Sequence, residues 1–537
     1  MKNAILVSLS VLFFQNFLWA SHKTRVLLVS AETTGIFQTG GLAHAVGGLA
    51  SAFNEEGIHA DIAMPYYLQM NAPSNLSYSN QHIDIGLDVR EGRAQREAEF
   101  FVVKAPAKNE GEIVFFRHAS TKNNYFDNRN TQGKKFYGPE ATLGEGFGAW
   151  SKAVSEYIVQ QNYDIVILND WHSSLVALFL DMAKKQGRRV PKVVTAIHNL
   201  AFQGLYPVSM LETLGIPSDY FAVEHGIEFY GKVNYLKAAI LMSDMVYTVS
   251  PNYAREISTP LFGAGLDGLM RKTNEENRLV GILNGIDNSK WDPAQSYHEA
   301  VQWTFTANDL TGKATGKAAL QKELNLPVKS DSPIYILTSR VAEQKGYEYL
   351  PQAIEQFLDQ REAQFVVIGD GEEAYIQKLK ALEQKFPNKL RYQKFSERSE
   401  KFLKAYGDFF INAAWFEPSG LNQMFALKNG TIPILSRVGG LSNSVHDDVS
   451  GFLFDIVWKD DRSGYDVKAT TNSLLSSLEK SLALYQQNPE KILAMRRVAM
   501  KVDNSWNSRV NREFTEVFKN YLKVSISAKT CAQSLSH

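Results

Sequence analysis

Short apolar runs alternate with helical patterns along the first half of the chain. Residues 25–29 read Arg-Val-Leu-Leu-Val, which is typical of a strand buried on both faces of a parallel sheet. The stretch 42–53 is apolar with small residues and is ended by Gly57, so it predicts a helix. Further strands are predicted at residues 60–64, 112–116, 164–168 and 192–197, and further helices at 148–160 and 174–185. The alternation predicts an α/β domain with a parallel sheet.

A similar alternation begins again after a turn-forming Asn-Gly-Ile-Asp cluster at residues 284–287. Strands are predicted at residues 334–339, 364–369, 409–412 and 432–436, with helices at 346–360 and 372–384. We therefore predict two Rossmann-like domains, over residues 24–285 and 286–502. Ligands bind at the carboxyl ends of parallel strands, so two facing domains would share one deep cleft.

Charge and cysteine content narrow the functional classes. The chain has 537 residues, and 57 Lys and Arg residues balance 57 Asp and Glu residues. A net charge of zero gives no overall reason to bind nucleic acid or anionic lipid, and 44% hydrophobic residues exclude disorder as the main state. Cys531 is the single cysteine, so neither an intramolecular disulfide nor a cysteine-based zinc site is expected.

The two ends of the chain differ from its body. Residues 1–20 have the layout of a signal peptide, with Lys2 ahead of an apolar stretch that Gln15 and Asn16 interrupt. The segment is either a signal peptide or an extension ahead of the first strand, and it is too short to predict a membrane span. The tail 524–537 is small and polar, which predicts disorder.

Candidate site residues of the first domain follow its strands. The first strand–helix turn carries Glu32 and the paired glycines Gly40 and Gly41, which would let backbone N–H groups approach a phosphate or a hydroxyl cluster. A plain tight turn is the alternative. Asp170 and His198 follow two later strands, and polar clusters at successive strand ends favour a functional site over a structural role.

The second domain supplies two cations and a carboxylate. Arg340 and Lys345 lie between a predicted strand and a predicted helix, where they suit the diphosphate of a departing nucleotide. A surface charge pair with Glu343 is the alternative. Glu417 lies just before a predicted helix whose first N–H groups lack partners, a position that suits binding of sugar hydroxyls.

In their order along the chain, these motifs resemble those of the bacterial glycogen synthases and plant starch synthases, retaining glycosyltransferases that use ADP-glucose. The resemblance covers residues 25–522. It implies the GT-B architecture of two facing Rossmann-like domains, with a C-terminal helix at residues 503–523 that crosses back to the first domain. The motifs that carry it are Gln38–Leu42, Asn169–His172, His198–Gly204, Thr248–Ile257, Phe262–Gly268, Ile282–Asp287, Arg340–Gly346, Phe416–Gln423 and Arg437–Leu441.

The resemblance also implies roles for individual residues. Arg340 and Lys345 would contact the donor diphosphate, and Glu417 would hold the transferred glucose. Asp170 and His198 would line the glucose pocket, where the His198 backbone carbonyl supports a cationic sugar in the transition state. The implied substrate-binding residues are Glu32, Gln38, Gly40, Gly41, His44, Asn199, Asn284, Phe395, Gly420 and Leu421, with Phe395 as the aromatic platform for adenine.

The implied reaction requires neither a metal ion nor a cofactor, because Arg340 and Lys345 supply the positive charge. Its expected partners are a nucleotide-sugar donor and an α-1,4-glucan acceptor, with no nucleic acid and no stable membrane span. The donor of the family is a cytoplasmic metabolite, which favours a cytoplasmic protein. Export would follow if residues 1–20 are a signal peptide.

Two departures from the family pattern fall in the glycine loop. The family has Lys-Thr-Gly-Gly-Leu-Ala-Asp, and here Gln38 stands for the lysine and His44 for the aspartate. A charged hydrogen bond is stronger than a neutral one by about 1–2 kcal/mol, so its loss predicts that transfer is slowed about tenfold or more. The leading hypothesis is transfer of glucose from ADP-glucose to an α-1,4-glucan. The alternatives are a weakly active or non-catalytic glucan- or nucleotide-binding descendant, and a glycosyltransferase that uses another nucleotide sugar.

Overall fold

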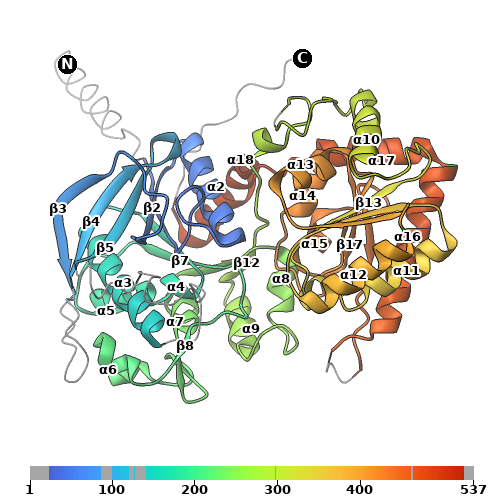
Figure 1. The fold of residues 1–537 in the computed structure, drawn as a ribbon. Coiled ribbons are helices and arrows are strands. Elements are labelled where there is room, and N and C mark those ends of the chain that lie inside the picture. Colours follow the sequence, from blue (N-terminus) through green and yellow to red (C-terminus); the bar gives the residue numbers. More distant parts are fainter. Residues whose placement is uncertain are drawn as a thin grey trace, which may run out of the picture.

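The computed structural model describes residues 23–85, 99–119, 126, 141–296, 298–460 and 464–524. The signal-like segment 1–20 and residues 525–537 of the predicted disordered tail lie outside the described residues. Figure 1 shows two lobes side by side, each built on its own β-sheet, with the first half of the chain in one lobe and most of the second half in the other. Along the described ranges, no helix is long and apolar enough to cross a membrane.

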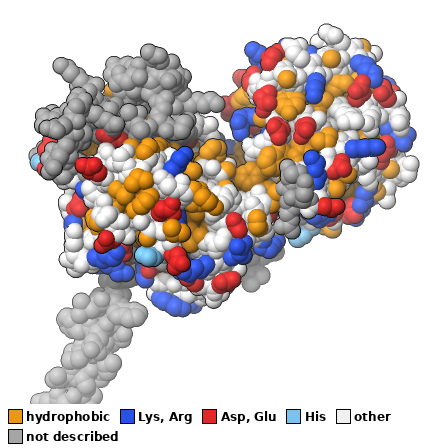
Figure 2. All heavy atoms as spheres, turned by 90° about the horizontal axis from the view of Figure 1, so that it is seen from below, with side chains coloured by type: hydrophobic (Ala, Val, Ile, Leu, Met, Phe, Trp, Pro, Cys, Tyr) orange, Lys and Arg blue, Asp and Glu red, His pale blue; other side chains and the backbone are white. Residues whose placement is uncertain are grey.

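The surface of the molecule mixes charges of both signs. Seen from below, acidic and basic side chains are interspersed over both lobes (Figure 2). Hydrophobic side chains also lie on this face, next to charged ones. The mixture agrees with the equal numbers of acidic and basic residues in the sequence.

The first lobe is built on a nine-stranded sheet in the order β12-β11-β7-β6-β1-β2-β5-β4-β3. Neighbouring strands from β12 to β5 pair in parallel, whereas β4 and β3 add an antiparallel edge that the sequence pattern does not predict. The predicted strands of this half are confirmed. The strands are β1 (Arg25–Val29), β2 (His59–Pro65), β3 (Ser77–Asp84), β4 (Glu99–Pro106), β5 (Glu112–His118), β6 (Ile165–Asn169), β7 (Lys192–Ile197), β11 (Met245–Thr248) and β12 (Leu279–Gly281), and a small separate sheet holds β8 (Leu205–Tyr206), β9 (Glu228–Phe229) and β10 (Lys232–Asn234).

Helices cover both faces of the first sheet. One face packs against α2 (Gly41–Glu55) and the C-terminal segment, and the other against α3 (Ala141–Val159), α5 (Leu175–Lys185) and α7 (Tyr235–Met242). Because helices cover both sides, β6 buries every one of its residues and β1 all but its first. The predicted helices are confirmed, although α3 begins earlier than its pattern indicates.

The end of the chain returns to the first lobe. Phe514 and Phe518 contact Phe53 of α2, and Phe514 also packs edge-on against Tyr247 of β11. These contacts confirm the predicted crossing back to the first domain. The segment starts with α18 (Trp506–Arg509) and continues through Val510–Phe514, α19 (Thr515–Val517) and Phe518–Leu522.

The second lobe is built on six parallel strands in the order β15-β14-β13-β16-β17-β18. The four strands predicted for this half are confirmed. The strands are β13 (Ile334–Thr338), β14 (Gln364–Ile368), β15 (Leu390–Gln393), β16 (Phe409–Asn412), β17 (Ile432–Ser436) and β18 (Phe452–Phe454). The helices are α10 (Thr311–Glu323), α11 (Leu350–Gln360), α12 (Glu373–Lys385), α13 (Glu397–Tyr406), α14 (Asn422–Lys428), α15 (Gly439–Ser444), α16 (Val467–Gln487) and α17 (Pro489–Lys501).

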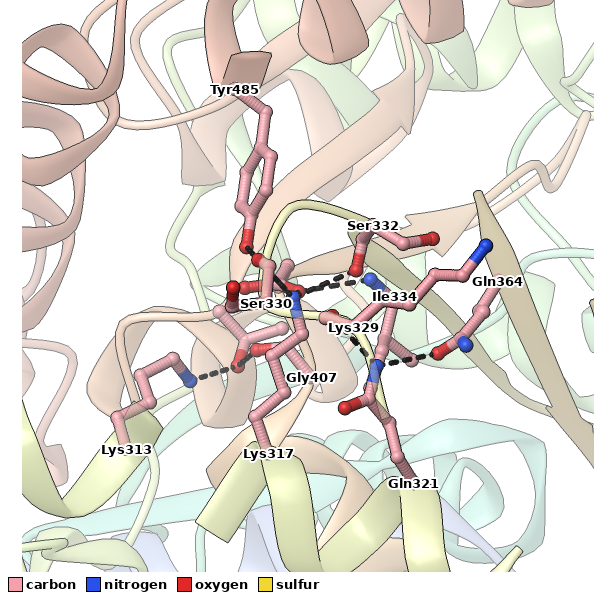
Figure 3. Close-up of polar contacts among 12 residues, drawn as sticks. Lys313, Lys317, Gln321, Lys329, Ser330, Ser332, Ile334, Gln364, Gly407 and Tyr485 are labelled. Carbon is pink, nitrogen blue, oxygen red and sulfur yellow. Dashed lines mark hydrogen bonds and ion pairs between the residues drawn. The ribbon is translucent and has the colours of Figure 1, made fainter. Parts of the chain in front are cut away.

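A buried polar network lies at the amino-terminal ends of β13 and β16. Helix α10 places Lys313, Lys317 and Gln321 one turn apart on one face, pointing toward the sheet (Figure 3). Lys317 Nζ lies 2.8 Å from Asp408 Oδ2, and Arg496 Nη2 lies 2.5 Å from the other carboxylate oxygen. Burial would raise the pKa of Asp408, but the charges of Lys317 and Arg496 lower it to about 2.

The linker after β12 ties the two lobes together. The Ile286 N–H donates to the Asn504 carbonyl at 2.8 Å, and the Trp506 N–H donates to the Ile286 carbonyl at 3.4 Å. Further along, Trp291 stacks on Phe425 of α14 with ring centroids 4.0 Å apart. The linker therefore contacts both the returning C-terminal segment and the second lobe.

Candidate functional site

The predicted site residues lie after neighbouring parallel strands in both sheets. In the first sheet, β7, β6 and β1 are adjacent and are followed by His198, Asp170 and Glu32. In the second sheet, β13 and β16 are adjacent and are followed by Arg340 and Glu417. The carboxyl ends of parallel strands meet at one edge, so the fold brings the candidates of each domain together.

Glu32 shapes the glycine loop. Its buried carboxylate accepts hydrogen bonds from the Thr39 N–H (2.5 Å), the Thr39 hydroxyl (2.6 Å) and the Gly40 N–H (3.3 Å). Helix α2 begins at Gly41 without a side-chain cap, and a Cβ atom added to Gly40 or Gly41 would point into open space. A ligand oxygen can therefore approach the first N–H groups of α2.

The two departures from the family pattern are in direct contact. Gln38 Nε2 lies 2.7 Å from His44 Nε2, so the amide donates and the imidazole accepts. An accepting Nε2 requires a neutral ring, and burial together with the charges of Lys290 and Lys401 lowers the pKa of His44. A lysine and an aspartate at these positions would form an ion pair instead. The two replacements are therefore coupled.

Asp170 organises the turn after β7. Its Oδ1 accepts the backbone N–H of His198 at 2.7 Å and that of Asn199 at 3.3 Å. Asp170 has a φ of +55°, a conformation that is uncommon outside glycine and that clusters at functional sites. Burial raises the pKa of Asp170 to about 7, although the two backbone N–H groups oppose the rise. The carboxylate is thus tied to the turn that carries His198.

The His198 ring is held by Asn169. His198 Nε2 donates to Asn169 Oδ1 at 3.0 Å, and Asn169 Nδ2 donates to the last carbonyl of β1 at 3.1 Å, which fixes the orientation of the amide. Burial lowers the pKa of His198 to about 4, so the ring is neutral near pH 7. His172, which lies in the same motif as Asn169, packs against the rings of Phe147 and Trp171 inside the first lobe.

Lys345 and Glu417 meet at the edge of the second sheet. Lys345 Nζ lies 2.5 Å from Glu417 Oε2, and the two side chains are 16% and 13% exposed. Gln344 braces this pair, because its Nε2 donates at 2.9 Å to the carbonyl of the residue before Glu417. Among the described residues no ion pair joins Glu343 to Lys345, so the alternative of a surface pair is wrong for this lysine. Arg340 lies beside the pair, with Nη2 at 3.5 Å from Gln344 Oε1.

The remaining candidates belong to the second lobe and the linker. Phe395 is 52% exposed, and its N–H donates to Asp370 Oδ2 at 3.2 Å, so its ring is available for stacking. Gly420 and Leu421 precede α14, where Leu421 joins a small apolar cluster with the linker. Asn284 is buried in the linker, and no hydrogen bond between described residues joins it to another predicted site residue.

The contact between the two lobes involves residues that the sequence analysis does not select. The Ser250 hydroxyl donates to the Pro418 carbonyl at 2.7 Å, and the Gly439 N–H donates to Glu256 Oε1 at 2.8 Å. Burial raises the pKa of Glu256 to about 7, against the hydrogen bond from Gly439. All four residues lie in motifs that carry the family resemblance, but the spacing of these motifs along the sequence does not show that they are in contact in the fold.

The described residues form no dedicated cluster of metal ligands. In the part of the chain that the structure describes, no group of three or more His, Cys, Asp or Glu side chains is placed to hold a metal ion. The positive charges beside Glu417 are those of Lys345, in contact with it, and Arg340, next to Gln344.

Two family models match the chain. Residues 25–272 match the starch synthase catalytic domain, and residues 321–464 match the glycosyl transferases group 1. The chain is 33% identical to the glycogen synthase of Thermodesulfovibrio yellowstonii, over 93% of this chain and 98% of that protein. It is 32% identical to the glycogen synthase of Lacticaseibacillus casei, over 93% of this chain and 99% of that protein.

Solved structures show the same architecture. The catalytic domain of starch synthase IV from Arabidopsis thaliana, bound to ADP and acarbose, matches with a TM-score of 0.78 and 27% identity over 94% of this chain and 100% of that one. A sucrose-phosphate synthase from Thermosynechococcus elongatus matches with a TM-score of 0.55 and 16% identity over 93% of this chain and 100% of that one, which shows the fold alone. The predicted GT-B architecture is confirmed.

Proposed function

This chain belongs to the family of bacterial glycogen synthases and plant starch synthases, and we propose that it transfers glucose from ADP-glucose to the non-reducing end of an α-1,4-glucan with retention of configuration. The donor would bind the second domain and the acceptor the first, so that transfer takes place between the facing strand ends. The starch synthase IV catalytic domain, solved with ADP and acarbose, supports an adenine nucleotide as the leaving group.

The ion pair between Lys345 and Glu417 is the observation that carries this proposal. In the free protein each charge neutralises the other in a mostly buried position, where an unpaired charge would be costly. A nucleotide sugar offers both groups new partners, a diphosphate for Lys345 and hydroxyls for Glu417. Donor binding would therefore separate the pair, and Lys345 with Arg340 would stabilise the charge that develops on the departing ADP.

On the first domain, we assign the glucose pocket to the turn that Asp170 holds. Asp170 fixes the backbone at His198 and Asn199, which would place the His198 carbonyl toward a cationic sugar before the reaction starts. A group fixed in advance costs no reorganisation in the transition state. Glu32 would keep the glycine loop open toward the donor, and the exposed ring of Phe395 would stack on adenine.

A weakly active or non-catalytic descendant is the rival proposal, and its motivation is the pair Gln38 and His44. The residues assigned to the leaving group and the glucose, Lys345 and Glu417, are both present and in contact. The curated relatives that match over nearly the whole chain are glycogen synthases. These observations favour the active enzyme.

Restoring the family residues in the glycine loop tests how much Gln38 and His44 lower the rate of transfer. We expect the double variant Gln38→Lys with His44→Asp to raise kcat/KM for ADP-glucose about tenfold, because it adds one charge-assisted hydrogen bond to the donor. Gln38→Lys alone should gain less, since a lysine beside His44 lacks a carboxylate to orient it. Initial rates are measured for wild type, both single variants and the double variant, which together form a double-mutant cycle. Unchanged rates in the double variant would remove the basis for the rival proposal.

Product analysis tests the proposed linkage and configuration. Incubation with glycogen and radiolabelled ADP-glucose should put label at the non-reducing ends, from which β-amylase releases it as maltose. Label that β-amylase cannot release would contradict α-1,4 transfer.

Chelation tests the requirement for a metal ion. We assign no metal ion or cofactor to the reaction, so EDTA should leave the initial rate unchanged. Loss of activity in EDTA that added Mg²⁺ restores would contradict the metal-free scheme.

A further inference from the structure

Two short helices form a contact between the lobes beside the proposed site. Helix α8 (Pro251–Glu256) belongs to the first lobe and lies against α15 of the second, at the junction seen in Figure 1. The Asn252 N–H donates to Asn443 Oδ1 at 2.8 Å, and Glu256 Oε1 accepts the Gly439 N–H at 2.8 Å. Ser250, which caps α8, donates its hydroxyl to the Pro418 carbonyl at 2.7 Å.

On the second lobe, the start of α15 packs against the segment that carries Glu417. The Gly440 N–H donates to the carbonyls of Glu417 (3.1 Å) and Pro418 (3.0 Å). A Cβ atom on Gly439 would lie 1.9 Å from the Glu417 carbonyl oxygen, so only glycine permits this approach. The backbones of Gly439 and Glu417 are therefore in direct contact.

Glu256 is an unusual residue to find at such a contact. Its Oε1 also accepts the Asn252 side-chain N–H at 2.7 Å, whereas its buried Oε2 has no hydrogen-bond partner among the described residues. A buried carboxylate with one unsatisfied oxygen is costly for stability alone. Across the domains, Glu256 accepts a hydrogen bond from the Gly439 N–H.

We propose that Glu256 is a positioning residue for glucose transfer, which acts from the first domain through Gly439 to hold Glu417 at the donor glucose. The inference rests on the proposed function, because it gives Glu256 a role in placing the residue assigned to the sugar. A carboxylate from the facing domain fixes Glu417 relative to Asp170 and His198. Displacement of a positioning contact by about 1 Å can cost about 100-fold in rate.

Two variants of Glu256 and a matched control test this role. Glu256→Ala removes the acceptor for the Gly439 N–H and should lower kcat about 10- to 100-fold, with KM for ADP-glucose close to that of wild type. Glu256→Gln keeps an oxygen acceptor and should recover most of the loss. The control is Glu276→Ala, since Glu276 makes an exposed ion pair with Arg278 in the same lobe, and it should leave kcat unchanged.

Hydrogen exchange gives a readout that does not depend on activity. In Glu256→Ala, the amides of Gly439 and Gly440 should exchange faster than in wild type, while those of β13 stay protected. If these amides exchange faster in Glu256→Ala but wild type itself shows no glucose transfer, the contact stands and the proposed function is refuted instead. Unchanged exchange together with unchanged kcat in Glu256→Ala would overturn the positioning role.

Discussion

Replacing Lys345 by alanine is expected to lower kcat for glucan elongation about 10²- to 10³-fold, because the variant loses a preorganised cation where charge develops on the departing ADP. Lys345 lies at the edge of the second sheet, 2.5 Å from Glu417 and mostly buried, where we propose that the donor diphosphate binds. Initial rates at saturating ADP-glucose measure the effect.

A lysine on the same lobe provides the control for this experiment. Lys385 forms exposed ion pairs with Glu355 and Asp359, so Lys385→Ala should keep the wild-type kcat. Glu417→Ala should lose activity to a similar degree, because the glucose would then lack its carboxylate partner. If Lys345→Ala kept more than half of the wild-type kcat, the assignment of Lys345 to the leaving group would be wrong.

The second large effect concerns stability, and it is expected for Asp408→Ala. Asp408 is buried between Lys317 and Arg496 and also accepts the Ile334 N–H at 2.9 Å. Its removal would leave two cations without their partner in the interior, which should reduce the free energy of unfolding of the second lobe by about 3–5 kcal/mol. Urea denaturation measures the change. In Glu362→Ala, which removes an exposed carboxylate, the loss should stay below about 1 kcal/mol.

The same carboxylate predicts a pH dependence of stability. The pKa of Asp408 falls from 3.8 to about 2 on folding, so the folded state binds fewer protons than the unfolded state between these values. The stabilisation, about 2–3 kcal/mol, is therefore complete above pH 4 and is lost as the pH falls toward 2. Asp408→Asn should flatten this part of the stability curve. An Asn variant that unfolds with the wild-type acid profile would contradict the assignment.

Much of the fold could be predicted from the sequence because parallel strands buried on both faces leave a simple pattern. Apolar runs such as residues 25–29 and 164–168 correspond to β1 and β6. The sequence pattern does not predict the antiparallel edge of β3 and β4, because β4 mixes buried and exposed positions and is not a strand buried on both faces. Asp170, His198 and Arg340 closely follow predicted strands, so their location at strand ends could be predicted as well.

The contacts between candidates could not be predicted in the same way. Spacing suggested that Lys345 serves a diphosphate, but only the fold shows that it pairs with Glu417 in the free protein. The contact between Gln38 and His44 turns two apparent losses into one coupled replacement. Glu256 was not selected, since its partner Gly439 is distant in the sequence and offers only a backbone N–H.

The most direct test of the central claim compares donors in one assay with the purified full-length chain. Initial rates of glucose incorporation into glycogen are measured with ADP-glucose and with UDP-glucose, for wild type and for Glu417→Ala. We predict incorporation by wild type from ADP-glucose and its loss in Glu417→Ala. No incorporation by wild type from either donor, or equal rates for wild type and Glu417→Ala, would contradict the proposed function.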